Sequence, residues 1–143
     1  MLSLTCKTAI KAVIFLSAKS EMGEKASMKE ISEHINASEH TVGKTMQRLV
    51  KEDLIKSLKG PTGGFYLTEE QQKQSISLIV EAIEGKTVFK ECGLGLSKCS
   101  EKHPCPIHND YKVARELLEK IFKEKQIRDL CDPVTNGLAF LMD

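Results

Sequence analysis

Residues 91–108 read ECGLGLSKCSEKHPCPIH and hold three of the five cysteines and two of the four histidines of the chain. Cys92 is separated by six residues from Cys99, which is separated by five from Cys105, and His108 follows after two more. Thiolates and imidazoles are ligands for zinc and for iron–sulfur clusters. This segment could therefore hold a metal, do redox chemistry or form disulfides, or its thiols could be unused.

The spacing of these cysteines bears on which metal they could hold. Structural zinc sites usually take cysteines in close pairs, about two to four residues apart. Here only Cys105 and His108 form a close pair. The even spacing favours a larger group such as an iron–sulfur cluster, in which imidazole can replace a thiolate. Leu94 and Leu96 would then shield the cluster from water. The spacing alone does not exclude a zinc ion or thiols that bind nothing.

The composition is that of a soluble globular protein. A chain of 143 residues with 41% hydrophobic and 29% charged residues can form one domain with a small appendage. The apolar run at residues 9–18 contains Lys11 and is too short to cross a membrane, so we expect a buried helix, no membrane partner and a cytoplasmic protein. Cysteines stay reduced there, which favours metal or redox chemistry over disulfides.

The first half of the chain has the pattern of a helix-turn-helix. Residues 4–18 carry apolar residues at helical spacing, and Ser27 and Glu30 form a predicted capping box for a second helix. Ser38 is placed to cap a third helix, EHTVGKTMQRLVKED. Gly43 inside it costs about 1 kcal/mol relative to Ala, and a close helix crossing is the structural reason for such a residue.

A β-hairpin is predicted directly after the third helix. Residues 54–58 and 64–68 read as short strands joined by a tip rich in Gly and Pro. A helix-turn-helix followed by a hairpin is typical of a winged helix. The predicted fold is therefore mainly α with a small β-hairpin, a winged helix-turn-helix followed by a long dimerisation helix.

A winged helix with a slightly basic first half predicts binding to double-stranded operator DNA. Residues 1–66 hold 10 Lys or Arg against 7 Asp or Glu, and a basic surface attracts phosphates. We expect residues near the start of the third helix to read base edges, and Lys51, Lys56 and Lys59 to neutralise phosphates. Each of these side chains could instead be merely solvated. The predicted DNA-binding residues are Ser38, His40, Thr41, Lys44, Arg48, Lys51, Lys59 and Thr62.

The second half of the chain predicts a helix, the cysteine loop and a long helix over residues 109–130. Ser75 and Gly85 bound the first helix, and the long helix has a broad apolar face that includes Leu117 and Ile121. We expect this face to contact a second copy, because a two-fold homodimer matches palindromic DNA. The alternative is that the face folds onto residues 138–142 of its own chain.

The combination of KGPTGGFYL at the hairpin, IVEAIEG after it, and the cysteine loop before a long helix resembles the Rrf2 family of bacterial transcription regulators. The resemblance spans residues 2–130 and includes the types that regulate iron–sulfur assembly, sense nitric oxide or repress cysteine metabolism. It implies a homodimer that binds operator DNA, usually as a repressor. In the cysteine-bearing branch it also implies an iron–sulfur cluster, of either the two-iron or the four-iron type.

The resemblance assigns the ligands of that cluster. Cys92, Cys99 and Cys105 match the ligand cysteines of the family, and His108 matches the fourth ligand in its iron–sulfur assembly regulator. Lys7 stands where the nitric-oxide sensor has an acidic cross-chain ligand, which favours His108. Cys6 is either a cross-chain thiolate or a small buried apolar residue. Cys131 is expected to be structural, and His103 has no counterpart.

The resulting division places a DNA-binding domain at residues 1–85, a cluster-binding loop at 86–108 and a dimerisation segment at 109–143. Gain, loss or oxidation of the cluster would then modulate operator binding in response to iron, nitric oxide or redox state. A small redox enzyme or electron carrier is the competing class. The sequence has no nucleophile–base constellation, phosphate-binding loop or paired carboxylates, so we expect no enzyme. A zinc-bound or metal-free thiol-sensing regulator is the remaining alternative.

Overall fold

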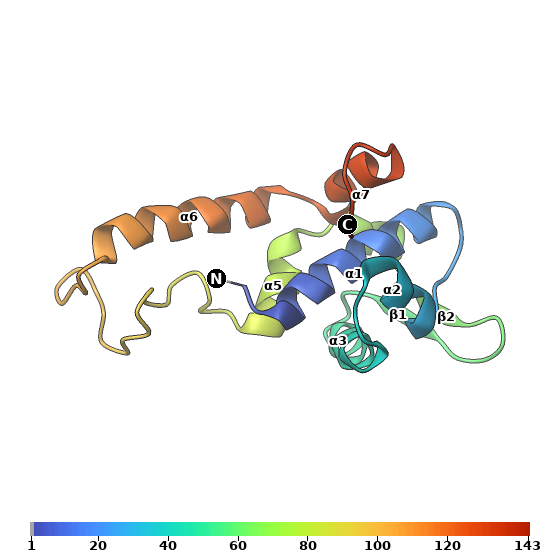
Figure 1. The fold of residues 1–143 in the computed structure, drawn as a ribbon, viewed down its shortest axis with the longest axis horizontal. Helices are drawn as coiled ribbons and strands as arrows, with labels where there is room; N and C mark the ends of the chain where they lie inside the picture. Colours follow the sequence, from blue (N-terminus) through green and yellow to red (C-terminus); the bar gives the residue numbers. More distant parts are fainter. Residues whose placement is uncertain (1) are drawn as a thin grey trace.

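A computed structural model describes residues 2–143 and is mainly helical with one two-stranded hairpin (Figure 1). The winged helix-turn-helix and the helices that pack on it form the body of the molecule. The cysteine loop and one long helix extend away from this body. The elements are α1 (Leu4–Glu21), α2 (Met28–Ile35), α3 (Glu39–Lys51), β1 (Lys56–Leu58), β2 (Gly64–Tyr66), α4 (Glu69–Gln72), α5 (Ile76–Glu84), α6 (His108–Glu124) and α7 (Ile127–Thr135).

The caps predicted for the helices of the first half are confirmed. Ser27 Oγ accepts a hydrogen bond from the N–H of Glu30, and Ser38 Oγ accepts one from the N–H of Thr41. The predicted capping box at Ser27 is only half formed, because the structure of residues 2–143 contains no return bond from the Glu30 side chain to the Ser27 N–H. Asn36, with φ of 52°, ends α2 in the left-handed conformation.

Helix α1 is the centre of the core. It packs against α2, α3, α5 and α7, so it is apolar on more than one face, as expected for a helix enclosed by others. Small residues on α1, including Ala9 and Ala12, let its neighbours approach closely. The largest fully buried side chains are Leu16, Ile31, Ile35, Met46, Leu49, Ile55, Ile76, Ile79 and Ile127.

The hairpin is shorter than predicted and lies against the turn before α2. Its strands pair antiparallel, with Lys56 opposite Tyr66 and Leu58 opposite Gly64. Phe65 and Ala26 exchange backbone hydrogen bonds of 2.8 and 3.0 Å, which fix the hairpin to the body. Gly64 has φ of 140° and its Cα faces the carbonyl oxygen of Ala26, so a larger residue would not fit there.

The single long helix predicted over residues 109–130 is wrong at its C-terminal end. Helix α6 stops at Glu124, and α7 begins at Ile127 after extended backbone at Lys125. The break forms because Lys125 accepts a hydrogen bond from the N–H of Ile76, and the N–H of Ile127 donates to Gln74. These tertiary bonds replace the continued helix and bring α7 back onto α1.

The C-terminal tail does not cover α6. Leu138 and Phe140 are 81% and 80% exposed, and Leu141, which follows them, packs against the core. On α6, Leu118 and Phe122 also pack against the core. The remaining large apolar side chains of α6, Val113, Leu117 and Ile121, are exposed by 68%, 58% and 47%. The fold-back alternative is therefore wrong, and an apolar face of α6 stays open.

No helix within residues 2–143 is both long enough and apolar enough to cross a membrane. The division of the chain at residues 85 and 108 stays a prediction.

Candidate metal centre and nucleic-acid interface

The three thiols of the cysteine loop come together in space. The Sγ atoms of Cys92, Cys99 and Cys105 all lie within 4.8 Å of one another. Cys92 Sγ and Cys105 Sγ are 3.6 Å apart. Cys105 is buried and the other two cysteines are half-buried. Three soft donors at such distances, and no disulfide between them, form a candidate metal centre.

His108 contacts this group at one point. It is the first residue of α6 and is 8% exposed, and its Nδ1 lies 3.1 Å from the Sγ of Cys99. The set of ligand atoms that all lie within 4.8 Å of one another consists of the three sulfurs and does not include the imidazole. The Nε2 atom of His108 is buried and has no hydrogen-bond partner among the described residues. The imidazole therefore stands beside the thiols, with Nδ1 as the nitrogen closest to them.

Cys92 and Cys99 differ in how readily their thiols ionise. Desolvation raises the pKa of Cys92, but hydrogen bonds from the backbone N–H groups of Leu96 and Leu94 and from the other two thiols outweigh it and bring the pKa to about 7. For Cys99 the backbone N–H of Cys105 lowers the pKa, but desolvation and the neighbouring sulfurs produce a net increase. Of these two thiols, Cys92 is the one whose environment favours the thiolate that metals require.

Helix α6 holds the loop through three neighbouring side chains. Arg115 donates from Nη1 to the carbonyl oxygens of Lys90 and Glu91, at 3.1 and 2.7 Å. The ring of Tyr111 lies against the Cα of Gly93, leaving no space there for a Cβ atom. Lys112 forms an ion pair with Glu101. Sequence reasoning missed these residues; the only signal was an arginine and a tyrosine on the otherwise apolar side of a helix.

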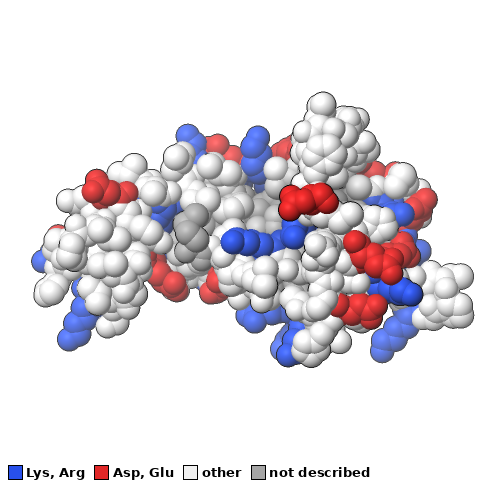
Figure 2. All heavy atoms as spheres, in the orientation of Figure 1, with Lys and Arg blue, Asp and Glu red and all other residues white. Residues whose placement is uncertain are grey.

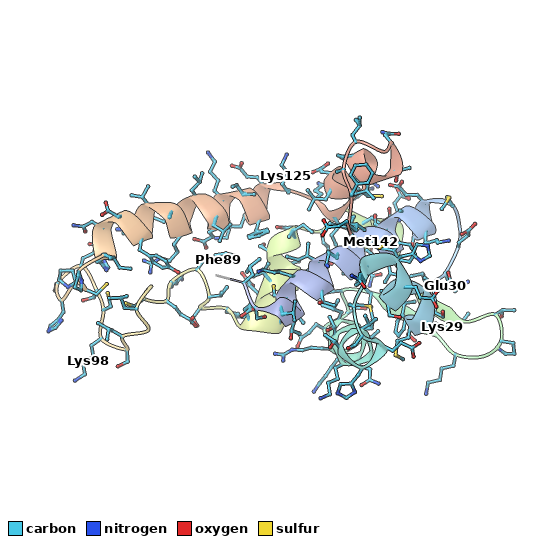
Figure 3. The ribbon with its side chains drawn as sticks, viewed as in Figure 1. Lys29, Glu30, Phe89, Lys98, Lys125 and Met142 are labelled. Atoms are coloured by element: carbon cyan, nitrogen blue, oxygen red, sulfur yellow. The ribbon has the colours of Figure 1, made fainter. Side chains whose placement is uncertain are left out.

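The base of the loop is anchored in the core. Gly85 ends α5 with φ of 99°, and Phe89 is buried and packs on Phe122 of α6, with ring centroids 6.0 Å apart. Figure 3 shows Phe89 between the loop and the body, whereas Lys98 points outward from the lower side of the loop. The loop is therefore fixed at its base and along α6, and is open to solvent at its outer end.

The loop has donors that suit an iron–sulfur cluster, and a hollow lies beside them. A hollow of about 390 Å³ adjoins the thiols and is lined by Cys92, Cys99, Gly95 and Leu96 among others. The N–H of Leu94 donates to Cys92 Sγ at 3.4 Å, the type of bond that stabilises thiolate ligands. Leu94 and Leu96, which were predicted to shield the cluster, are each 53% exposed, and their shielding of a cluster stays a prediction.

Cys6 and Cys131 lie apart from the loop thiols. Both are fully buried, and burial raises the pKa of both thiols, that of Cys6 to about 12 with help from the charge of Glu84. A buried, protonated thiol behaves as a small apolar residue. This position favours the structural interpretation of both cysteines over a cross-chain thiolate role for Cys6.

The predicted DNA-binding side chains on α3 lie on its outer surface. Val42, Met46 and Leu49 are buried, whereas His40, Lys44, Arg48 and Lys51 are exposed and Thr41 is half-buried. Ser38 and Thr41 also have local roles, because their hydroxyls hydrogen-bond each other at 2.8 Å in the cap of α3. Gly43 lies against Met28 of α2, which is the close crossing that explains a glycine in this helix.

The hairpin tip adds exposed groups to the same part of the surface. Lys59 and Thr62 are both exposed. Figure 2 shows basic side chains along the lower edge of this face, below α3 and towards the hairpin. Lys56 differs from the others because it pairs with Asp53 at 2.6 Å, which offsets its charge. The structure therefore groups the predicted positions, while their contact with DNA stays a prediction.

Two polar contacts that sequence reasoning missed fix the helix-turn-helix to its neighbours. Gln71 is buried and donates from Nε2 to the carbonyl oxygen of Asp53, in the turn between α3 and β1. Lys11 donates from Nζ to the carbonyl oxygen of Ile35, at the C-terminal end of α2. The basic residue in the apolar run of α1 therefore has a structural partner.

Comparison with known proteins identifies the family. The Rrf2 model, described as an iron-dependent transcriptional regulator, matches residues 2–133. The regulator NsrR of Oceanobacillus iheyensis is 28% identical over 134 residues, which are 93% of this chain and 90% of that protein. A helix-turn-helix transcriptional regulator of Aquifex aeolicus is 34% identical over 91 residues, so that the match spans 62% of this chain and 63% of that relative.

Solved structures agree with this fold. CymR, the global cysteine regulator of B. subtilis, superposes with a TM-score of 0.72 at 21% identity, covering 92% of this chain and 96% of that one. T. potens IscR superposes with a TM-score of 0.71 at 18% identity, covering 97% and 91%. The winged-helix fold predicted from the sequence is confirmed, and the matched proteins are regulators of transcription rather than enzymes. The chain belongs to the Rrf2 family of transcriptional regulators.

Proposed function

We propose that this Rrf2 regulator is a homodimeric repressor that binds operator DNA through α3 and the β1–β2 wing. Its affinity for DNA is set by an iron–sulfur cluster held by Cys92, Cys99, Cys105 and His108. The observation that carries the proposal is the convergence of the three loop sulfurs, within 4.8 Å, on a loop that leaves directly from a helix packed against α3.

The DNA-binding part rests on the outer face of α3 and the exposed tip of the wing. His40, Thr41 and Lys44 occupy the first turns of α3, which is the part of a recognition helix that contacts base edges. Arg48, Lys51 and Lys59 carry exposed charge suited to phosphates. Ser38 and Thr62 would contribute hydroxyl contacts at the ends of this surface.

The dimer rests on the open apolar face of α6. Val113, Leu117 and Ile121 are spaced four residues apart and therefore form one stripe along the helix. A second copy of the same stripe is a natural partner, because a two-fold contact pairs a surface with itself. Such a dimer would present two α3 helices to two half-sites of an operator.

The cluster would be held by three cysteines of the loop and by the first residue of α6. The three thiols supply the soft ligands, and His108 supplies an imidazole nitrogen at the start of α6. When bound, the cluster supplies iron that can exchange electrons and ligands. Arg115 and Tyr111 fix the loop backbone around Cys92, so they set the position of that ligand.

A continuous set of contacts could carry the state of the loop to the DNA surface. The loop begins at Gly85, directly after Ile83 and Glu84 of α5. Glu84 accepts hydrogen bonds from the N–H and hydroxyl of Ser3, at the start of α1. A hollow of about 390 Å³ is lined by Ser3 and Ile83 together with Lys44 and Arg48 of α3. A shift at the end of α5 would therefore alter the surroundings of α3.

Anaerobic purification tests the cluster. We expect a coloured protein with iron and acid-labile sulfide in matching amounts, and a colourless protein from Cys99→Ala. His103→Ala removes an exposed histidine of the same loop and should keep the colour. A wild-type protein that stays free of iron after anaerobic reconstitution would refute the cluster.

Selection from a random DNA library, followed by binding measurements across salt concentrations, tests the DNA surface. Lys59→Ala should lower the slope of log affinity against log salt by about 1, because it removes one phosphate contact. His40→Ala should instead cost about 1–3 kcal/mol at particular base pairs. Lys120→Ala, on the exposed side of α6, should change neither. Equal operator binding by wild type and Cys99→Ala would contradict regulation by the cluster.

A further inference from the structure

We infer that the cluster-free loop is itself a site for one tetrahedral, thiophilic divalent cation of the zinc class. Its ligands would be the sulfurs of Cys92, Cys99 and Cys105, with His108 closing the fourth position. Because the same sulfurs would hold the cluster, the ion and the cluster exclude each other. The ion site stands independently of the proposed function, and only the exclusion rests on it.

The distances between the sulfurs match one small ion. Zinc binds thiolates at about 2.3 Å, so two thiolates on one tetrahedral ion lie about 3.8 Å apart. Cys92 Sγ and Cys105 Sγ are 3.6 Å apart, and all three sulfurs lie within 4.8 Å of one another. A single ion could therefore contact all three sulfurs with only small side-chain adjustments.

A cluster requires larger distances between the same sulfurs. Thiolates that bind different irons are separated by those irons and by the bridging sulfides, so they must lie farther apart than thiolates on one ion. The 3.6 Å separation is thus too short for Cys92 and Cys105 to bind different irons. The loop would have to open towards the hollow beside Cys92 and Cys99 to take a cluster.

His108 is placed to supply the fourth ligand. Its Nδ1 is 3.1 Å from Cys99 Sγ, close to the edge of about 3.6 Å expected between a thiolate and an imidazole on one ion. The residue is buried and its Nε2 has no partner among residues 2–143. A modest movement of the ring towards the sulfurs would complete a Cys₃His set, a known structural zinc arrangement.

Cobalt(II) is the probe, because its absorption reports tetrahedral thiolate coordination. The full-length protein is freed of metal with a chelator and titrated with Co²⁺ without oxygen and with a thiol-free reductant. We expect one Co²⁺ per chain, intense visible bands of tetrahedral cobalt, a sulfur-to-metal charge-transfer band, and displacement by Zn²⁺. Octahedral spectra, or a stoichiometry other than one per chain, would overturn the inference.

Variants test the ligand set. Cys99→Ser should weaken Co²⁺ binding more than about 100-fold, beyond the loss typical of an outer-shell partner. His108→Ala should weaken it at least about tenfold and shift the visible bands. His103→Ala is the matched control and should bind as wild type. Circular dichroism identifies any variant that fails to fold, and Cys105→Ser then serves as the second ligand variant. Full affinity in correctly folded Cys99→Ser would refute the site.

Reconstitution of zinc-loaded protein with iron and sulfide tests the exclusion. We expect cluster yield to fall in proportion to the fraction of chains that hold zinc, and to recover when zinc is chelated. Simultaneous full occupancy by zinc and cluster would refute exclusion. If the metal-free protein binds Co²⁺ but never takes a cluster, the proposed function fails while the ion site stands; the opposite result removes the ion site alone.

Discussion

The guanidinium of Arg115 donates a 2.7 Å hydrogen bond to the carbonyl oxygen of Glu91, the residue directly before Cys92. A second bond from the same nitrogen reaches Lys90. One side chain on α6 therefore fixes two successive peptide groups directly before Cys92, the first candidate ligand in the chain. Hydrogen bonds to a charged donor contribute about 1.5–3 kcal/mol each, so this contact can decide how well the loop is ordered before metal binds.

Arg115→Lys should weaken metal retention while leaving the fold intact. A lysine ammonium is a single point of charge and does not reproduce the planar fork of arginine. We expect about a 10- to 100-fold loss in affinity, the range typical of residues that orient metal ligands. The measurement is the Co²⁺ titration, with Lys120→Ala as the control on the same helix. Wild-type affinity in Arg115→Lys would show that the loop orders without this clamp.

Gly93 and Tyr111 provide an independent test of loop position. A Cβ atom added at Gly93 would lie 2.7 Å from the ring of Tyr111, and an aromatic ring cannot move aside as a flexible chain end can. Gly93→Ala should therefore displace Cys92 and lower metal affinity about tenfold or more. The double variant Gly93→Ala/Tyr111→Ala should bind metal better than Gly93→Ala. An additive loss in the double variant would mean that the two residues act separately.

Local sequence signals predicted the winged-helix half of the fold well. Ser38 as a cap, the buried Val42, Met46 and Leu49, and the hairpin after α3 all follow from spacing within a few residues. The break at Lys125 could not be predicted in this way. It depends on hydrogen bonds to Gln74 and Ile76, about fifty residues earlier in the chain, and nothing at residues 124–127 resembles a strong helix stop.

The candidate site was only partly predictable for the same reason. The cysteines and His108 are visible in the sequence because their residue types are rare and their spacing is short. The distances between these side chains in space are not visible in the sequence. The sequence spacing favoured a cluster, but the sulfur distances in the structure also suit a single ion. Arg115 and Tyr111 lie more than fifteen residues from Cys92, so only the packing of α6 on the loop reveals their contribution.

The exposed stripe on α6 predicts the oligomeric state. Leu117→Glu places a charge at the centre of this stripe, and burying an unpaired charge in a dimer interface costs several kcal/mol. We expect wild type to sediment as a dimer at micromolar concentration and Leu117→Glu as a folded monomer. Lys120→Glu, on a polar part of the same helix, should remain dimeric. A dimeric Leu117→Glu would place the interface elsewhere.

The buried thiol of Cys6 predicts how stability changes in alkaline solution. Burial, assisted by Glu84, raises its pKa from the ordinary value of 9.0 to about 12. Below pH 9 the thiol is protonated in both folded and unfolded chains, so its contribution is constant. Between pH 9 and 12 only the unfolded thiol ionises, so the free energy of unfolding should fall as pH rises, by up to about 1.4 kcal/mol per pH unit. Cys6→Ala removes this dependence.

Urea unfolding at pH 8, 9 and 10 should therefore show a steeper decline in the free energy of unfolding for wild type than for Cys6→Ala. Parallel declines would mean that the thiol titrates near its ordinary pKa in the folded chain.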